Sequence, residues 1–225
     1  MRTLFKLFKY LFCTLLICIF CGVGFMYYAY QEVIPNYAID DTILSVRATD
    51  TYVPLSEIST TFLDAIVAVE DREFYKHSGL DFSSLGRAFI TNIYNGEIKQ
   101  GGSTITQQLA KNLFLDSSQN LSRKVKEVCL THYLESHYSK QDILELYVNV
   151  IYYGDNNTGI YEASTNYFNK LPSELNFNEA TMLAGFPQAP SYYSANTAAA
   201  LVRQTQVISA LTEYSDTYDD LARSY

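Results

Sequence analysis

The sequence predicts a mainly α-helical domain that follows one N-terminal transmembrane helix. A long apolar run without charges lies near the N-terminus, and apolar residues recur at helical spacing along most of the chain after it. Hydrophobic residues make up 48% of the 225 residues and charged residues only 18%, a composition that excludes wholesale disorder. The net charge of -8 argues against a nucleic-acid partner, because phosphate backbones attract basic surfaces.

The N-terminal segment combines a basic leader with an apolar run. Residues 1–9 carry three cations and no carboxylate, and residues 10–30 carry no charge. About 20 apolar residues in a helix span roughly 30 Å, the thickness of a bilayer core. A cleaved signal peptide would have a shorter apolar region and an A-x-A-like site, whereas this run ends in tyrosines. We expect a single-pass protein of the cell membrane, with its leader in the cytoplasm and its main domain outside.

The elements after this anchor are predicted from periodicity, prolines and capping residues. Residues 31–54, which contain two prolines, are expected to form an extended connector with a short β-like alternation at residues 43–47. Residues 55–212 are expected to form the helical domain, and residues 213–225 a polar, frayed tail. Helices are expected at residues 62–74, 85–93, 103–114, 122–137, 139–147, 161–168, 179–184 and 195–211. The expected N-caps of the fourth, fifth and seventh are Ser122, Ser139 and Asn178.

Cysteine and histidine positions do not match metal-site spacings. After the apolar run the sequence has no CxxC pair and no HExxH motif, and His132 and His137 are five residues apart, so they do not share a helix face as i, i+4 histidines would. We expect both at the surface and no dedicated metal site. Cys129 is the single cysteine after the apolar run, so the domain must be held together by burial rather than by an internal disulfide.

Residues 65–81 contain the first candidate catalytic group. An apolar helix there ends in Glu70, and a carboxylate at such a place can be partly desolvated, which raises its pKa toward the working range of a general base. The alternative is an amphipathic helix whose charged end reaches solvent.

Two further segments are rich in hydrogen-bond donors or cations. Residues 100–115 begin with a Gly pair followed by hydroxyls and amides, which suits an anion or a sugar at a helix N-terminus; the alternative is a loop with an ordinary Ser/Thr cap. Residues 123–127 place three cations beside one acid in an otherwise acidic chain, as a phosphate or pyrophosphate clamp requires. The alternative is a solvated helix face.

In this order the segments resemble the motifs of the peptidoglycan glycosyltransferases. This lysozyme-like family includes monofunctional transglycosylases and the polymerase domains of bifunctional penicillin-binding proteins. The resemblance covers about residues 50–210, and GGSTITQQL downstream of ED-x-x-F-x-x-H-x-G is highly specific. The matching segments are EDREFYKHSG (Glu70–Gly79), GGSTITQQLAKN (Gly101–Asn112), RKVKE (Arg123–Glu127), KQDILELYVN (Lys140–Asn149), EASTNYFNK (Glu162–Lys170) and LAGFPQAPSYYS (Leu183–Ser194).

The resemblance implies a lysozyme-like glycosyltransferase domain at residues 55–212 that polymerises glycan strands from lipid II by inverting transfer and releases polyprenyl pyrophosphate. Glu70 would be the general base, and Glu127 a second carboxylate that orients the donor or the cations. The implied substrate-binding residues are Ser103, Thr106, Gln107, Gln108, Lys111, Asn112, Arg123, Lys124 and Lys126. The residues that would shape the Glu70 loop are Asp71, Phe74, His77 and Gly79.

The resemblance also implies partners. These are lipid II, the growing glycan strand, the membrane and a separate transpeptidase, because S-x-x-K and K-T-G motifs are missing from this sequence. No cofactor is required, although Mg²⁺ or Mn²⁺ could neutralise the pyrophosphate. Residues 80–94 are expected either to dip into the membrane surface, as in the family, or to belong to the core.

Two positions depart from the family pattern, and two other functions stay open. Gln119 replaces an arginine, which weakens the expected clamp, and Asn169 replaces a glycine in a turn that Asn can also adopt. A lysozyme-like hydrolase is one alternative, but it would need a protonated acid rather than a cationic clamp. A catalytically weak or inactive scaffold that binds lipid II or wall-synthesis partners is the other.

Overall fold

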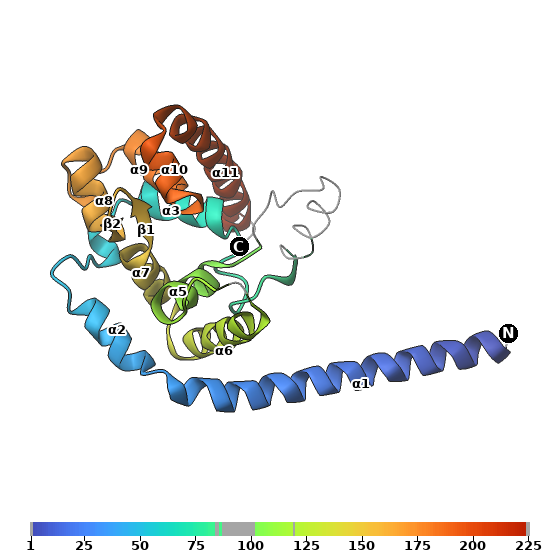
Figure 1. Ribbon diagram of the computed structural model, residues 1–225. Coiled ribbons are helices and arrows are strands. Elements are labelled where there is room, and N and C mark those ends of the chain that lie inside the picture. Colours follow the sequence, from blue (N-terminus) through green and yellow to red (C-terminus); the bar gives the residue numbers. More distant parts are fainter. Residues whose placement is uncertain (1, 84–85, 87–101, 119, 224–225) are drawn as a thin grey trace.

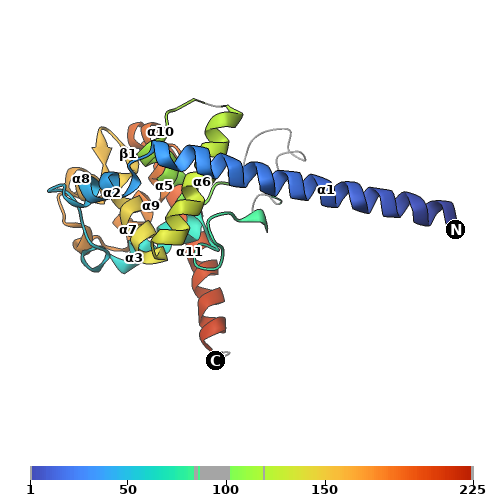
Figure 2. The same ribbon diagram turned by 90° about the horizontal axis from the view of Figure 1, so that it is seen from below.

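The computed structural model describes residues 2–83, 86, 102–118 and 120–223. A long helix, α1 (Arg2–Val33), extends away from a helical domain in both views (Figures 1 and 2). Strands β1 (Tyr152–Gly154) and β2 (Asn157–Thr158) pair antiparallel and form the one sheet among the described residues. The predicted mainly α-helical class is confirmed.

Helix α1 presents apolar side chains to its surroundings along most of its length. Phe20 is 81% exposed and Leu11 is 70% exposed. By length and composition, the segment Lys6–Asn36 is long and apolar enough to cross a membrane, and a signal sequence would pass the same test. The last turns of α1 contact the domain, where the rings of Tyr30 and His132 pack edge to face with centroids 5.6 Å apart.

The segment after α1 is helical rather than extended. A 3-10 turn at Ile34–Asn36 leads into α2 (Ile39–Arg47), so the β-like alternation predicted at residues 43–47 is wrong. Ile39 and Ile43 are one helical turn apart and are both buried against the domain. Arg47, in the last turn of α2, lies 2.6 Å from the carboxylate of Asp142. Contacts with distant residues therefore favour the helix over the extended form.

The domain packs its helices in two groups that meet at the candidate site. Helix α3 packs against α9 and α11, and α5 packs against α6 and α7 (Figure 1). The core contains fully buried side chains from both groups, among them Phe62, Ile66, Ile105 and Leu109. The helices are α3 (Thr60–Glu70), α5 (Ile105–Phe114), α6 (Leu121–His137), α7 (Lys140–Val150), α8 (Gly159–Phe168), α9 (Phe177–Gly185), α10 (Pro190–Ala195) and α11 (Thr197–Arg223). Short 3-10 turns lie at Leu55–Glu57, Pro172–Glu174 and Phe186–Gln188.

Most predicted helices are confirmed within a few residues at each end, whereas two predicted caps are wrong. Ser139 caps α7 as expected. Asn120, not Ser122, caps α6 by accepting the Arg123 N–H at 2.8 Å, and Asn176, not Asn178, caps α9. Asn and Ser cap helices about equally well, so residue type alone does not decide which position is the cap.

The C-terminal part of the chain continues as helix. A frayed tail was expected at residues 213–225, but α11 continues as a helix to Arg223. Tyr214 is buried, and the carboxylate of Glu213 accepts a hydrogen bond from Arg72 at 2.8 Å, so the tail is tied to the loop after α3. The helix expected at residues 85–93 lies outside the described residues.

Candidate active site

Glu70 is the last residue of α3, and its side chain is only 10% exposed. Its carboxylate accepts a hydrogen bond from Gln108 Nε2 at 2.8 Å and lies 3.6 Å from Arg203 Nη2. Burial raises the pKa of the Glu70 carboxyl. The Gln108 hydrogen bond and the charges of Arg203 and Lys111 act in the opposite direction, while the charge of Asp71 acts with burial. The partly desolvated carboxylate expected from the sequence is therefore present.

Gln108 is held in one orientation by a tyrosine behind it. The hydroxyl of Tyr147 on α7 donates to Gln108 Oε1 at 3.2 Å, which leaves the amide nitrogen to donate to Glu70. Tyr147 is completely buried, so this hydrogen bond is shielded from water. The chain of contacts from Tyr147 through Gln108 fixes one oxygen of the Glu70 carboxylate.

The second carboxylate, Glu127, lies on α6 and is more fully paired. Its side chain is 3% exposed and accepts hydrogen bonds from Gln107 Nε2 at 3.2 Å, from Arg123 Nη1 at 2.9 Å and from the Lys124 ammonium. Arg123 and Lys124 precede Glu127 by four and three residues, so one helix face brings all three together. A buried carboxylate with two cationic partners holds those cations in fixed positions.

The N-terminal turn of α5 connects the two carboxylates. Thr104 caps the helix, with its hydroxyl accepting the Gln107 N–H at 3.1 Å and its own N–H donating to Gln107 Oε1 at 3.1 Å. The same Gln107 side chain donates to Glu127, while its neighbour Gln108 donates to Glu70. Two adjacent amides on one helix turn therefore set the positions of both acidic groups.

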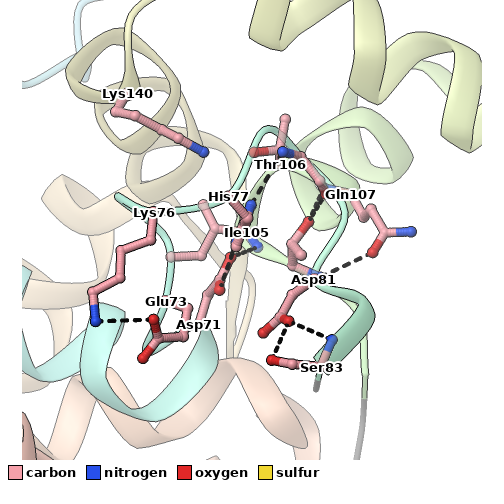
Figure 3. Close-up of polar contacts among 12 residues, drawn as sticks. Asp71, Glu73, Lys76, His77, Asp81, Ser83, Ile105, Thr106, Gln107 and Lys140 are labelled. Atoms are coloured by element: carbon pink, nitrogen blue, oxygen red, sulfur yellow. Dashed lines mark hydrogen bonds and ion pairs between the residues drawn. The ribbon is translucent and has the colours of Figure 1, made fainter. Parts of the chain in front are cut away.

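The loop after Glu70 is tied to the same helix end (Figure 3). Asp71 accepts hydrogen bonds from His77 Nε2 at 2.9 Å and from the backbone N–H of Ile105, the first residue of α5, at 2.9 Å. The N–H of Gly79 donates to His77 Nδ1 at 3.1 Å. This arrangement fits a neutral imidazole that carries its proton on Nε2.

Gly79 and Phe74 complete the shape of this loop. Gly79 has φ +94°, and a Cβ there would lie 2.7 Å from Thr131 Cγ2, so a larger residue would displace α6. Phe74 is fully buried, with the ammonium of Lys140 4.4 Å from its ring centroid. The four residues that the sequence predicted to shape the loop, Asp71, Phe74, His77 and Gly79, all make contacts of that kind.

A cationic cavity of about 790 Å³ lies between the end of α5 and the start of α6. Lys111, Asn112, Arg123 and Lys124 contribute to its walls, together with one carboxylate, Asp116. Lys126 instead lines an adjoining cavity of about 310 Å³, which it shares with Arg123. Because Lys111 also acts on the pKa of Glu70, the cationic cavity and the carboxylate are electrostatically connected.

A model of the transglycosylase family matches residues 39–212, which is most of the chain. The chain belongs to the transglycosylase family. Membership of this family implies peptidoglycan glycosyltransferase activity. The match begins at Ile39, the first residue of α2.

Three relatives illustrate the breadth of this family. The chain is 47% identical to penicillin-binding protein 1F of Bacillus subtilis (strain 168) over 142 residues, 39% identical to a "putative transglycosylase" of Cupriavidus necator over 175 residues, and 46% identical to penicillin-binding protein 1A of Aquifex aeolicus over 143 residues. The alignments cover 63%, 77% and 64% of this chain. They cover 75% of the Cupriavidus protein but only 20% of each penicillin-binding protein, so the chain spans about a fifth of those two relatives.

Two residues that the resemblance assigned to the substrate groove of this transglycosylase lie in the interior instead. Thr106 is fully buried, and its hydroxyl donates to Glu135, which also pairs with Lys140 at 2.8 Å. Gln107 is 2% exposed, and both atoms of its amide are already paired within the protein. Both side chains are therefore engaged within the protein, where they hold their neighbours in position.

The other expected groove residues lie where a ligand could reach them. Ser103 is exposed immediately before α5, and Lys111 and Asn112 are exposed on its last turns. His132 and His137 are exposed, as predicted. Asn169 adopts φ +54° at the end of α8, so the turn survives the replacement of glycine. Gly101, Gln119 and most of the segment 80–94 lie outside the described residues, although Phe82 within that segment is 75% exposed.

Two residues next to the carboxylate were not identified from the sequence. Arg203 on α11 is far from Glu70 along the chain, and no local pattern marks it, because a single arginine in an Ala-rich helix reads as an exposed residue. Tyr147 lies within the motif Lys140–Asn149. Its position in the apolar pattern predicts that it is buried but does not predict its hydrogen-bond partner, Gln108. Among the residues that the structure describes, no group of three or more His, Cys, Asp or Glu side chains could hold a metal ion.

Proposed function

We propose that this protein polymerises peptidoglycan glycan strands from lipid II, with Glu70 as the general base. Glu70 takes the proton from the 4-hydroxyl of the acceptor sugar while that oxygen attacks the anomeric carbon of the donor. The bond from this carbon to the pyrophosphate breaks, so the configuration inverts and polyprenyl pyrophosphate leaves. The observation that carries the proposal is a buried carboxylate, oriented by Gln108, on which Lys111 acts from the wall of a cationic cavity.

The cations of the cavity suit the leaving group. Negative charge develops on the departing pyrophosphate, and cations that are already in place stabilise it without reorganisation. Lys111, Arg123 and Lys124 line the cavity, and Glu127 holds the last two from behind. We assign Glu127 to positioning this clamp rather than to proton transfer, because its carboxylate is already engaged by three donors.

The long apolar helix suits a substrate with a lipid tail. We propose that α1 anchors the protein in the cell membrane as a single span, with the N-terminus in the cytoplasm and the catalytic domain outside. Lipid II is confined to the bilayer, so an anchored enzyme meets it by diffusion in two dimensions. Cross-linking of the product would be the task of a separate transpeptidase.

A divalent cation is proposed as optional in this mechanism. Three cationic side chains already face the cavity, and a Mg²⁺ or Mn²⁺ ion bound to the pyrophosphate would add to their charge. We expect turnover to persist in the presence of a chelator. Complete loss on chelation, restored by added Mg²⁺ or Mn²⁺, would show that the side chains are not sufficient.

The test is polymerisation by the full-length protein in detergent with purified lipid II. We expect muramidase-sensitive strands from the wild type and none from E70Q, which keeps the shape of the side chain but cannot accept the proton. The matched control is D64N, which makes the equivalent change at an exposed position on the same helix and should retain activity.

Three outcomes would contradict the proposal. Full activity of E70Q would remove Glu70 from the mechanism. Shortening of added glycan, instead of growth of new strands, would favour a hydrolase. Binding of lipid II by a folded wild-type protein that forms no polymer would favour a scaffold.

A further inference from the structure

The C-terminal helix supplies a second contact to the proposed base. Arg203 of α11 reaches across to α3, where its Nη2 lies 3.6 Å from Glu70 Oε1. Gln108 occupies the other oxygen of the same carboxylate at 2.8 Å. Both members of the Arg203–Glu70 pair are only 10% exposed, so solvent screens their attraction far less than it would screen a surface pair.

Arg203 is fixed by contacts that do not involve Glu70. Its Nε donates to the carbonyl of Gly185 at 3.3 Å, and its Nη1 donates to Gln206 Oε1 at 3.2 Å. Gly185, at the end of α9, makes room for it, since a Cβ there would lie 2.8 Å from Arg203 Cγ and 3.3 Å from Val207 Cγ2. The guanidinium is therefore already in place before any substrate binds.

We propose that Arg203 is a positioning residue for Glu70, which keeps the carboxylate ionised and fixes its orientation together with Gln108. The inference rests on the proposed function of Glu70 as base. Arg203 acts through Glu70 and is not assigned a contact with the substrate, because Glu70, the Gly185 carbonyl and Gln206 already engage its guanidinium.

The other groups that face Glu70 cannot take over this task. Asp71 carries a negative charge, and Tyr147 and Tyr153 on the neighbouring α7 and β1 are neutral hydroxyls in the interior. Lys111 is the other cation that acts on Glu70, but it is exposed in the cavity proposed for pyrophosphate. A bound pyrophosphate would offset the charge of Lys111 at the moment when the base is needed. Arg203, behind the carboxylate, would keep its effect.

The test is the pH dependence of kcat for full-length R203Q and R203K. Loss of an opposite charge at this range raises the pKa of a carboxyl by about one unit or more. The acid limb of the R203Q profile should therefore move to higher pH by about one unit. At pH values on the acid side of that limb, kcat of R203Q should be about tenfold lower than that of the wild type, and on the plateau the two should differ far less. R203K retains the charge and should keep most of the wild-type limb. R47Q removes an arginine that pairs with Asp142 and is the matched control.

A second variant and a readout without turnover separate this inference from the proposed function. G185A pushes Arg203 aside without changing either charged group, and should move the limb in the same direction by a smaller amount. The carboxyl carbon of Glu70, labelled with ¹³C and identified by its loss in E70Q, reports the titration even if the wild type forms no polymer. An unchanged Glu70 titration in R203Q and G185A, with kcat lowered equally at all pH values, would overturn the inference.

Discussion

Glu70 and Glu127 are both buried carboxylates held by adjacent glutamines of α5, yet their surroundings differ. Glu127 accepts hydrogen bonds from one amide and two cations, whereas Glu70 accepts one from an amide and has its arginine at 3.6 Å. Close donors and cations stabilise the ionised form of a carboxyl group, whereas burial without them destabilises that form. The difference supports our proposal that Glu70 accepts the proton while Glu127, with its two close cations, holds the clamp.

The largest expected effect comes from exchanging each carboxylate for its amide. E70Q should lower kcat by about 10²–10⁴-fold, the typical contribution of a positioned base. E127Q should retain base chemistry but release Arg123 and Lys124, so we expect about 2 kcal/mol of lost stability, less than for a fully buried pair because Lys124 is 42% exposed. Steady-state kinetics and denaturant unfolding of both variants check this. Equal loss of kcat with no loss of stability in E127Q would contradict the division of tasks.

A second effect concerns the pH dependence of stability. Burial raises the pKa of Glu70 above its ordinary value of 4.5, so ionising it costs folding free energy. The contribution of this group to stability is complete below pH 4.5 and is lost as pH rises through the raised pKa. E70Q should therefore unfold at a higher temperature than the wild type at pH 8, and the two should converge near pH 4. Thermal unfolding of both proteins at pH 8 and near pH 4 tests this. If the difference in unfolding temperature is the same at both pH values, ionisation of Glu70 is not its cause.

The smallest expected effect concerns the tyrosine behind Gln108. Y147F removes one buried hydrogen bond and leaves Gln108 Oε1 unpaired, which should cost about 1 kcal/mol of stability. Because the amide can then rotate, kcat should fall by a few-fold with little change in KM. Y133F, which removes the hydroxyl contact to Asp40 near the surface, is the control and should leave kcat unchanged. Unchanged kcat in Y147F would indicate that Gln108 is oriented without the tyrosine.

Local sequence patterns predicted much of this molecule because the features concerned are themselves local. The apolar stripe of α3 placed Glu70 at the end of a buried helix, and the cation pair before Glu127 lies on one helix face by its spacing alone. Helix α2 was misread because its burial depends on a surface formed by distant residues. The burial of Thr106 was not foreseen, because a motif gives the residue but not the direction of its side chain, which here is set by Glu135.

The position of Arg203 shows the same limit more sharply. Its partner Glu70 lies on α3, far away along the chain, and the packing of α11 on α3 brings the two together. The arginine and the glycine that makes room for it are separated along the sequence by a 3-10 turn and α10. Such a contact follows from the complete fold and from no segment of it.

Helix α1 has a mechanical consequence for the product. It runs without interruption to Val33, and its last turns pack on α6, the helix that carries the clamp residues. If α1 spans a bilayer, the continuous helix and its packing on α6 would hold the domain at a fixed distance from the lipid, and the cavity with it. If the proposed polymerisation is correct, each sugar unit would then be added at the same height above the membrane.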